Sequence, residues 1–230
     1  GDNCSRRRSS SPLLPSAALA DRLQAIRAEL PAHTRLLAVS KGHQADQIRA
    51  LAGLGQRSFG ESRLQEATAK QQQLADLVDL DWHFIGRLQA NKVRAVLRQF
   101  GTIHGLDSLA LAQRMARIAA EEGLRPRVLL QVKLRPDPSK GGMAEAELRQ
   151  NWSELRALAP LQIIGLMTMA PLGFSPPQRA GLFGDCAALA SELGLPELSM
   201  GMSGDWREAA AAGSTWVRIG TALFGAQADT

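Results

Sequence analysis

Short apolar segments that alternate with helical patterns constrain the fold of this chain more than any other feature. Runs rich in Leu, Ile and Val recur about eight times, and a segment with helical apolar spacing follows nearly every one. Strands that alternate with helices of about ten or more residues pair in parallel through right-handed crossovers. The pattern therefore predicts an α/β fold, and about eight units predict closure into a single TIM-type (β/α)8 barrel.

The alternative to a barrel is an open, doubly wound sheet. A chain of 230 residues fits one large barrel domain, and no linker divides it. The glycine-rich dinucleotide fingerprint of doubly wound folds does not follow the first strand. We therefore expect one barrel domain at residues 16–230. Residues 1–15 are rich in Ser, Arg and Pro and are expected to form a disordered tail.

The apolar periods also place the individual elements. An extra N-terminal helix is expected at 16–30, capped by Ser16 and stopped by Pro31. The barrel strands are expected at 36–41, 57–59, 82–85, 102–104, 128–134, 162–167, 198–200 and 216–219. The helices between them are expected at 45–54, from after 61 to 77, and at 89–100, 109–122, 145–158, 178–193 and 206–212.

Charge and cysteine content narrow the classes of partner. The net charge is +5, but the arginines are scattered along amphipathic helices among acids, which argues against nucleic-acid binding. No apolar run reaches the ~18 residues that a membrane span requires. Cys4 and Cys186 lie far apart without metal-ligand spacing, so we expect no metal site and a reducing cytoplasm. Arg6-Arg7-Arg8 faintly resembles a twin-arginine signal, but two prolines interrupt the apolar part that follows.

Lys41 ends the first apolar run, Leu36-Leu37-Ala38-Val39-Ser40. A strand buried on both faces would place this lysine at its carboxyl end, where α/β proteins bind ligands. Only five of the 27 Lys and Arg residues are lysines, so a lysine here invites a chemical explanation. A neutral lysine amine forms a Schiff base with an aldehyde. The alternative is a strand-end lysine that simply reaches water.

Two loops near the C-terminus have the composition of a phosphate site. Ser199-Met-Gly-Met-Ser-Gly-Asp and Arg218-Ile-Gly-Thr follow the last two expected strands. The corresponding loops of TIM barrels often bind phosphate through backbone amides and small residues. Glycine-rich loops and serine caps also begin and end ordinary helices, which is the alternative. An aldehyde-binding lysine and a phosphate loop at one barrel mouth together describe a site for pyridoxal 5'-phosphate (PLP).

Several segments then resemble a known family in order and spacing. They are Ala38-Val-Ser-Lys, Phe59-Gly-Glu, Trp82-His-Phe-Ile-Gly, Leu88-Gln-Ala-Asn-Lys, Ser139-Lys-Gly-Gly, Gly165-Leu-Met, Leu198-Ser-Met-Gly-Met-Ser and Val217-Arg-Ile-Gly-Thr-Ala-Leu-Phe-Gly. This set resembles the YggS/PROSC family of pyridoxal phosphate homeostasis proteins across residues 36–225. The resemblance implies a barrel like the N-terminal domain of alanine racemase.

The resemblance also implies roles for five residues. Lys41 would form the Schiff base, and Ser203, Gly220 and Thr221 would hold the phosphate. Arg218 would lie near the pyridine nitrogen, where a cation discourages ring protonation and weakens the cofactor as an electron sink. The family usually has Gly-Glu-Asn where this chain has Ser62 after Gly60-Glu61, so Ser62 is not counted as a site residue.

The expected function is intracellular PLP homeostasis, as a carrier or regulator without substantial catalysis. The alternative is a PLP-dependent amino-acid racemase or decarboxylase. Two-base racemization needs a second acid, a tyrosine on another domain in the alanine racemase pattern, and this chain has no tyrosine. PLP-dependent apo-enzymes and a regulated protein remain open as partners, and we expect a monomer. His83 could pack against the cofactor or be a satisfied core histidine, and Lys140 is a candidate for secondary aldehyde capture.

Overall fold

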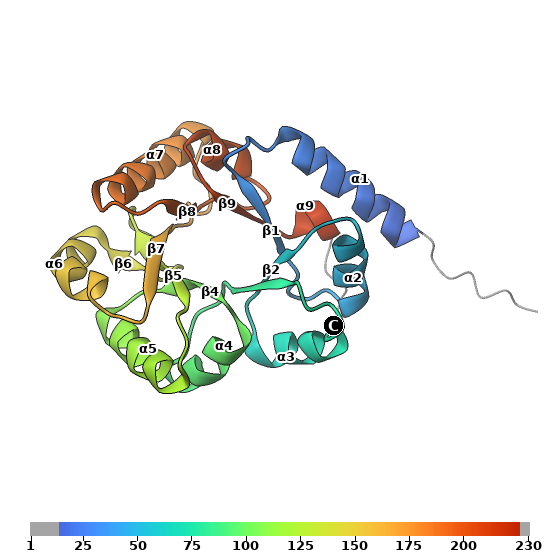
Figure 1. Cartoon of the computed structure of the whole chain (residues 1–230). Coiled ribbons are helices and arrows are strands. Elements are labelled where there is room, and N and C mark those ends of the chain that lie inside the picture. The colour runs from blue at the N-terminus through green and yellow to red at the C-terminus, as the bar shows by residue number, and fades with distance from the viewer. Residues whose placement is uncertain (1–13, 226–230) are drawn as a thin grey trace, which may run out of the picture.

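The eight strands of the barrel close on themselves. The computed structural model describes residues 14–225, and burial from residue 17. Each barrel strand pairs in parallel with the next, and the last, β9, pairs with the first, β1, which confirms the predicted barrel (Figure 1). The barrel strands are β1 (Arg35–Val39), β2 (Ser58–Glu61), β3 (Asp81–Phe84), β4 (Thr102–Leu106), β5 (Arg127–Lys133), β7 (Gln162–Met167), β8 (Glu197–Ser199) and β9 (Trp216–Ile219).

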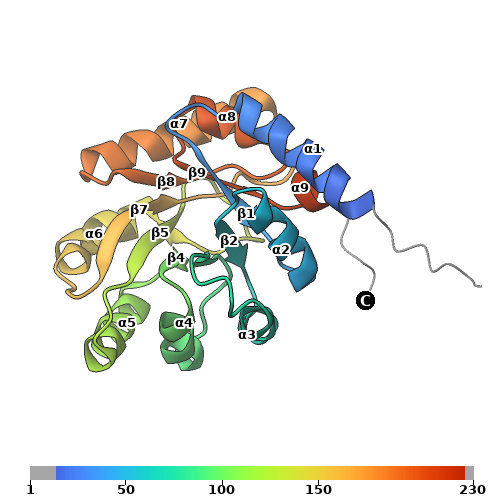
Figure 2. The same cartoon turned by 45° about the vertical axis from the view of Figure 1, so that its right-hand side comes forward.

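A ring of helices surrounds the strands, as Figures 1 and 2 show. These helices bury the outward-facing apolar side chains of the strands, while the inward-facing ones fill the barrel. The ring consists of α2 (Ala45–Gly53), α3 (Leu64–Gln73), α4 (Val93–Gln99), α5 (Leu109–Glu122), α6 (Glu145–Arg156), α7 (Pro176–Glu192) and α8 (Trp206–Ala211).

The predicted elements differ from the observed ones at a few boundaries. The helix predicted to reach residue 77 ends at Gln73, and turns follow it to Leu77. The helix predicted at 89–100 opens as a 3-10 turn, η1 (Ala90–Lys92), before α4 begins. A short strand, β6 (Met143–Ala144), pairs with β5 outside the ring, and it was not predicted because two residues carry no period.

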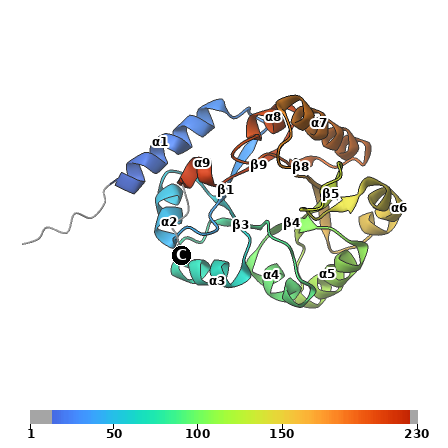
Figure 3. The same ribbon diagram turned by 180° about the vertical axis from the view of Figure 1, so that it is seen from behind.

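Helix α1 (Leu14–Glu29) lies outside the ring against α2 and the short helix α9 (Thr221–Phe224), as Figure 3 shows from behind. Its buried side chains are Leu19, Leu23 and Ile26. The helix begins two residues before Ser16, so the predicted serine cap is wrong. The predicted tail lies outside the described residues up to residue 13, and residues 14 and 15 open the helix.

Contacts from α1 hold α9, the element that follows the second candidate phosphate loop. Arg22 Nε donates to the carbonyl oxygen of Leu223 at 2.5 Å, and Arg22 Nη2 donates to that of Phe224 at 3.3 Å. Leu223 and Phe224 are themselves buried in the same apolar cluster as Leu19 and Leu23. The extra helix therefore positions a loop at the barrel mouth. Within residues 14–225, no helix combines the length and apolarity that a membrane crossing requires.

Candidate functional site

Lys41 and the Gly220-Thr221 loop lie at the same edge of the barrel, on neighbouring strands. Ala38 of β1 pairs with Ile219 of β9, so both strands end at the same level. Lys41 follows β1 by two residues and is half-buried. Gly220 and Thr221 follow β9 directly. The structure therefore brings together two predicted features that lie about 180 residues apart in the sequence.

The loop after β8 contacts the loop after β9 through Ser203. Its hydroxyl oxygen accepts a hydrogen bond from the backbone N–H of Ala222 at 3.2 Å. Gly201 has φ of +97°, and a Cβ there would lie 2.7 Å from the Cβ of Ala209, so only glycine fits. The carboxylate of Asp205 accepts from the N–H of Met202 at 2.7 Å and closes the loop. A glycine and a side-chain hydrogen bond thus shape the loop after β8, and Ser203 links it to the loop after β9.

Arg218 lies buried beneath these loops. Its Nη1 donates to the hydroxyl of Ser199 at 2.5 Å, and its Nη2 donates to the carbonyl oxygen of Thr168 at 3.3 Å. Burial lowers the pKa of the guanidinium to about 10, so the side chain remains protonated at neutral pH. The backbone N–H of Arg218 also donates to the carbonyl oxygen of Gly201 at 2.8 Å, which joins β9 to the loop after β8.

A cavity of about 300 Å³ opens at this part of the mouth. It brings Arg218 together with Lys140 and with the glycine-rich loop that carries Ser203. Lys41, Gly220 and Thr221 are not part of its lining and lie on the adjoining edge of the mouth. The lining residues are Lys140, Met169, Ala170, Pro171, Leu172, Gly173, Phe174, Arg179, Gly201, Met202, Gly204, Asp205 and Arg218.

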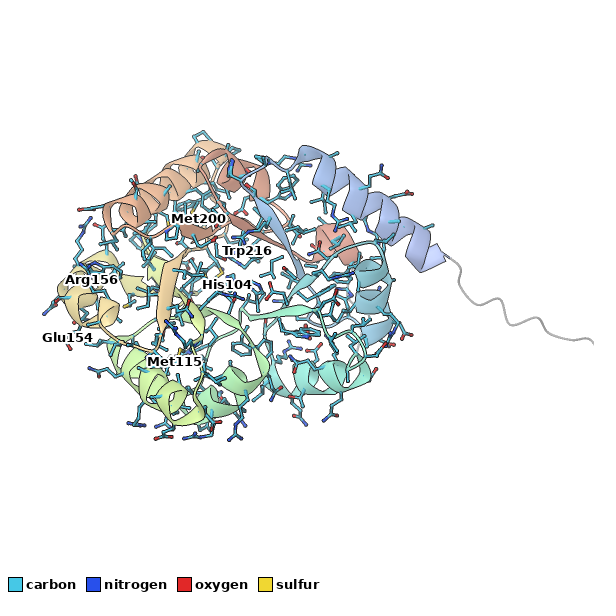
Figure 4. The ribbon with its side chains drawn as sticks, in the orientation of Figure 1. His104, Met115, Glu154, Arg156, Met200 and Trp216 are labelled. Carbon is cyan, nitrogen blue, oxygen red and sulfur yellow. The ribbon has the colours of Figure 1, made fainter. Side chains whose placement is uncertain are left out.

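Two buried histidines connect Arg218 to the opposite end of the barrel. His104 Nδ1 lies 2.8 Å from the Ser199 hydroxyl, and its Nε2 lies 2.8 Å from His83 Nδ1. His83 Nε2 lies 2.7 Å from the carboxylate of Asp81, the first residue of β3. Figure 4 shows His104 and Trp216 inside the ring of strands. Of the two interpretations of His83, this geometry is that of a core histidine with partners on both nitrogens.

Two groups in this chain of hydrogen bonds, His104 and Asp81, have shifted pKa values. Burial, and then the nearby His83 and Arg218, lower the pKa of His104 well below its usual value, so its ring is neutral. Burial opposes ionisation of Asp81, but the interactions with His83, Ser58 and Arg127 together outweigh it and lower the pKa of this carboxyl. His104 Nδ1 shares a hydrogen bond with the Ser199 hydroxyl, which is also the acceptor for Arg218 Nη1. The chain therefore orients the acceptor that Arg218 uses.

Lys70 is a residue that the sequence did not single out, and it lies directly beneath Lys41. Only 7% of its side chain is exposed, and its Nζ donates to the backbone carbonyl oxygen of Ser40 at 2.7 Å. It forms an ion pair with Glu61, which is 1% exposed, at 2.7 Å, and the Ser40 hydroxyl donates to the same carboxylate at 2.9 Å. Burial raises the pKa of Glu61, although Lys70 and Ser40 partly oppose the shift.

One feature of the sequence indicated part of the cluster of Glu61, Glu66 and Lys70. Glu66 and Lys70 are four residues apart on a predicted helix, a spacing typical of surface ion pairs. That spacing does not show that the pair faces the barrel. Within residues 14–225, no group of three His, Cys, Asp or Glu residues has the arrangement of a metal site.

The closed parallel barrel, with candidate binding loops at the carboxyl ends of its strands, matches a known protein family. The model described as "Alanine racemase, N-terminal domain" matches residues 15–228. Alanine racemase from Corynebacterium glutamicum has a TM-score of 0.72 at 21% identity, over 94% of this chain and 62% of that one. At this identity the likeness concerns the fold alone.

More similar relatives identify the family within this class. A "Pyridoxal phosphate homeostasis protein" from Synechocystis sp. is 50% identical over 204 residues, covering 86% of this chain and 94% of the relative. The one from Pseudomonas aeruginosa is 42% identical over 200 residues, covering 86% of each chain. PipY of Synechococcus elongatus, solved with PLP bound, has a TM-score of 0.87 at 48% identity, over 90% of this chain and 100% of that one. The chain therefore belongs to the pyridoxal phosphate homeostasis protein family, as its motifs indicated.

Proposed function

We propose that this protein binds PLP at the barrel mouth, through a Schiff base to Lys41, and serves in PLP homeostasis. The observation that carries the proposal is the placement of Lys41 beside the Gly220-Thr221 loop on adjacent strands. One small molecule could therefore contact both the Lys41 amine, through an aldehyde, and the Gly220-Thr221 loop, through a phosphate. A relative of 48% identity solved with PLP bound, PipY, supports the choice of ligand.

The residues at the mouth have the chemistry that PLP requires. Ser203 and Thr221 supply hydroxyl donors for the phosphate, with backbone amides of the two loops. Gly220 allows the end of β9 to approach β1 closely, because a Cβ there would lie 3.3 Å from the carbonyl oxygen of Val39. The proposed roles of Lys41, Ser203, Arg218, Gly220 and Thr221 therefore suit both ends of the ligand.

Each residue has a definite task in this proposal. Lys41 would hold PLP covalently, because its amine can form a Schiff base with the aldehyde and release one water. Bound PLP supplies an aldehyde and an electron-withdrawing ring. The protonated guanidinium of Arg218, oriented by Ser199, would lie near the ring nitrogen and keep it unprotonated. The site would then hold the ligand without strongly activating it.

We further propose that the protein is a carrier or regulator in the cytoplasm, monomeric, and not an enzyme. Its relatives are named homeostasis proteins, although the fold is related to racemases. PLP-dependent apo-enzymes that receive PLP, or a regulated protein, are the partners that fit this role. Cys186 is a free, buried thiol, as suits a reducing compartment. The second candidate, an amino-acid racemase or decarboxylase, rests on that fold relationship and on the same lysine.

The proposal is tested by adding PLP to the purified protein and recording its absorbance. We expect a band near ~420 nm and, after borohydride reduction, a pyridoxyl group mapped to Lys41 by mass spectrometry. The Lys41→Ala variant should remain colourless, whereas Lys140→Ala should keep the wild-type spectrum. A full amount of reducible PLP in Lys41→Ala would show that the lysine is assigned wrongly.

The phosphate loops predict that phosphate contacts dominate affinity. A hydrogen bond to a charged group contributes roughly 1.5 to 3 kcal/mol, so Ser203→Ala and Thr221→Val should each weaken PLP binding about tenfold or more. Pyridoxal, which lacks the phosphate, should bind poorly to the wild type and equally poorly to both variants. Isothermal titration or equilibrium dialysis measures these affinities. Equal wild-type affinity for PLP and pyridoxal would contradict the assignment of the loops.

A further inference from the structure

We propose that Glu66 and Lys70 of α3 form a clamp that holds the backbone on both sides of Lys41 and so positions its amine for reaction. The proposal deepens the proposed function and rests on Lys41 being the attachment point for PLP. Glu66 and Lys70 are positioning residues in this proposal, because they act through the backbone and do not touch the ligand.

The clamp is defined by two hydrogen bonds to the peptide groups that flank Lys41. On the N-terminal side, Lys70 Nζ donates to the carbonyl oxygen of Ser40 at 2.7 Å. On the C-terminal side, the N–H of Gly42 donates to Glu66 Oε1 at 2.5 Å. The same Glu66 oxygen pairs with Lys70 Nζ at 2.9 Å. One ion pair therefore binds the residue before Lys41 and the residue after it.

The clamp is itself anchored to the barrel. Lys70 pairs with the buried Glu61 at the end of β2, and the Ser40 hydroxyl donates to that carboxylate. The N–H of Ser40 donates to the carbonyl oxygen of Gly60 at 3.0 Å, which continues the pairing of β1 with β2. Two barrel strands and a helix thus meet directly below Lys41.

Gly42 explains why the C-terminal side needs a partner. Its φ is +77°, so the chain turns sharply after Lys41, at a conformation that favours glycine. The hydrogen bond from Gly42 to Glu66 fixes the direction of this turn. Burial opposes ionisation of Glu66, but hydrogen bonds from Lys70 and Gly42 outweigh it and lower the pKa of this carboxyl, which keeps a charged acceptor in place near neutral pH.

The expected consequence concerns reaction rather than ligand retention. A lysine side chain already has many rotamers, and movement of its backbone would add to the spread of amine positions. Holding the backbone in place removes this second source of disorder. Loosening the turn should slow formation of the Schiff base, which needs Lys41 Nζ to attack the aldehyde carbon before water can leave in the following step. The phosphate loops lie on other strands, so their contribution to binding should be unaffected.

The test separates binding from reaction with two ligands. Pyridoxine 5'-phosphate carries the phosphate but no aldehyde, so its affinity reports on the phosphate loops alone. The rate of the ~420 nm band after mixing with PLP reports on the reaction of Lys41. In Glu66→Ala we expect this rate to fall about tenfold, the effect of one positioning hydrogen bond. The affinity for pyridoxine 5'-phosphate should change less than about twofold.

Matched variants distinguish the clamp from a general effect. Glu66→Gln keeps an oxygen acceptor for Gly42 and should restore most of the rate. Glu154→Ala removes a glutamate on the outer side of α6, as Figure 4 shows, and should match the wild type. Glu66 is 26% exposed, so Glu66→Ala should fold, and its thermal midpoint is measured alongside. The double variant Glu61→Gln with Lys70→Met removes the Ser40 side without leaving an unpaired buried charge, and it should be slowed similarly.

The outcomes separate this proposal from the proposed function. A wild type that never develops the band would refute the role of Lys41 itself. A wild type that reacts, together with a Glu66→Ala variant that reacts equally fast, would refute the clamp alone. An equal loss of pyridoxine 5'-phosphate affinity and of rate would also overturn the clamp, because the effect would then be a general loss of the site.

Discussion

Replacing Lys70 by methionine is expected to lower the free energy of unfolding by about 3 to 5 kcal/mol, the usual cost of removing one partner from a buried ion pair. Glu61 is 1% exposed and would lose the cation that lies 2.7 Å from it. The carbonyl oxygen of Ser40 would lose one of its two donors and keep the N–H of His43. Denaturation by urea, followed by circular dichroism, measures the difference. The exposed Lys92, replaced in the same way, should change stability little.

The loss of unfolding free energy in Lys70→Met should depend on pH, and the direction of this dependence should identify Glu61 as the titrating group. Burial raises the pKa of Glu61, so the folded protein binds this proton more tightly than the unfolded chain does. The cost of a charged Glu61 is therefore absent below the unfolded-state pKa of about 4.3 and grows as the pH rises through the folded-state pKa. Without Lys70 that cost increases, so the difference between variant and wild type should be smallest near about pH 4.

A second substitution serves as the control for this assignment. Adding Glu61→Gln to Lys70→Met removes the titrating group, so the pH dependence of the difference should largely disappear and part of the stability should return. A Lys70→Met protein as stable as the Lys92→Met protein at neutral pH would mean that the buried pair contributes nothing.

Amino acids are expected to turn over more slowly than ~1 s⁻¹, the low end of ordinary enzymes, even when PLP is bound. The protonated Arg218 near the ring nitrogen would reduce stabilisation of a carbanion. The chain has no tyrosine to act as the second acid of the alanine racemase pattern. General acid/base groups typically contribute 10² to 10⁴-fold, so roughly 3 to 5 kcal/mol of barrier lowering would be absent.

This prediction is measured with L- and D-amino acids in deuterated water. Deuterium incorporation at Cα, chiral inversion and release of carbon dioxide cover racemization and decarboxylation. Reactivation of a PLP-dependent apo-enzyme serves as a parallel assay of PLP donation. Sustained turnover near ~1 s⁻¹ that disappears in Lys41→Ala would replace the carrier role with the racemase or decarboxylase alternative.

Some elements could be predicted to the residue because their ends are local. Helix α5 begins and ends as predicted, since the Ser108 hydroxyl accepts from the N–H of Leu111 and Gly123 takes a left-handed conformation after the last turn. Such caps involve residues within a few positions of each other and are visible in a sequence. The start of α1 was wrong because Ser16, a good cap by type, lies inside the helix.

The alternation of apolar strands and helices determined the parallel α/β class, and the missing dinucleotide fingerprint favoured the barrel over an open sheet. The same alternation placed Lys41, Gly220 and Thr221 at strand ends and Ser203 in the loop after a strand. Strand ends share one edge in any parallel barrel, so the position along the chain determines the side of the molecule. Only the tertiary structure decided which side chains meet inside it. His104 and Ser199 are 95 residues apart and meet inside the barrel, and Lys70 reaches Ser40 over 30 residues through the packing of α3. Hydrogen bonds and ion pairs act over a few ångströms, and periodicity carries no information about distances that short.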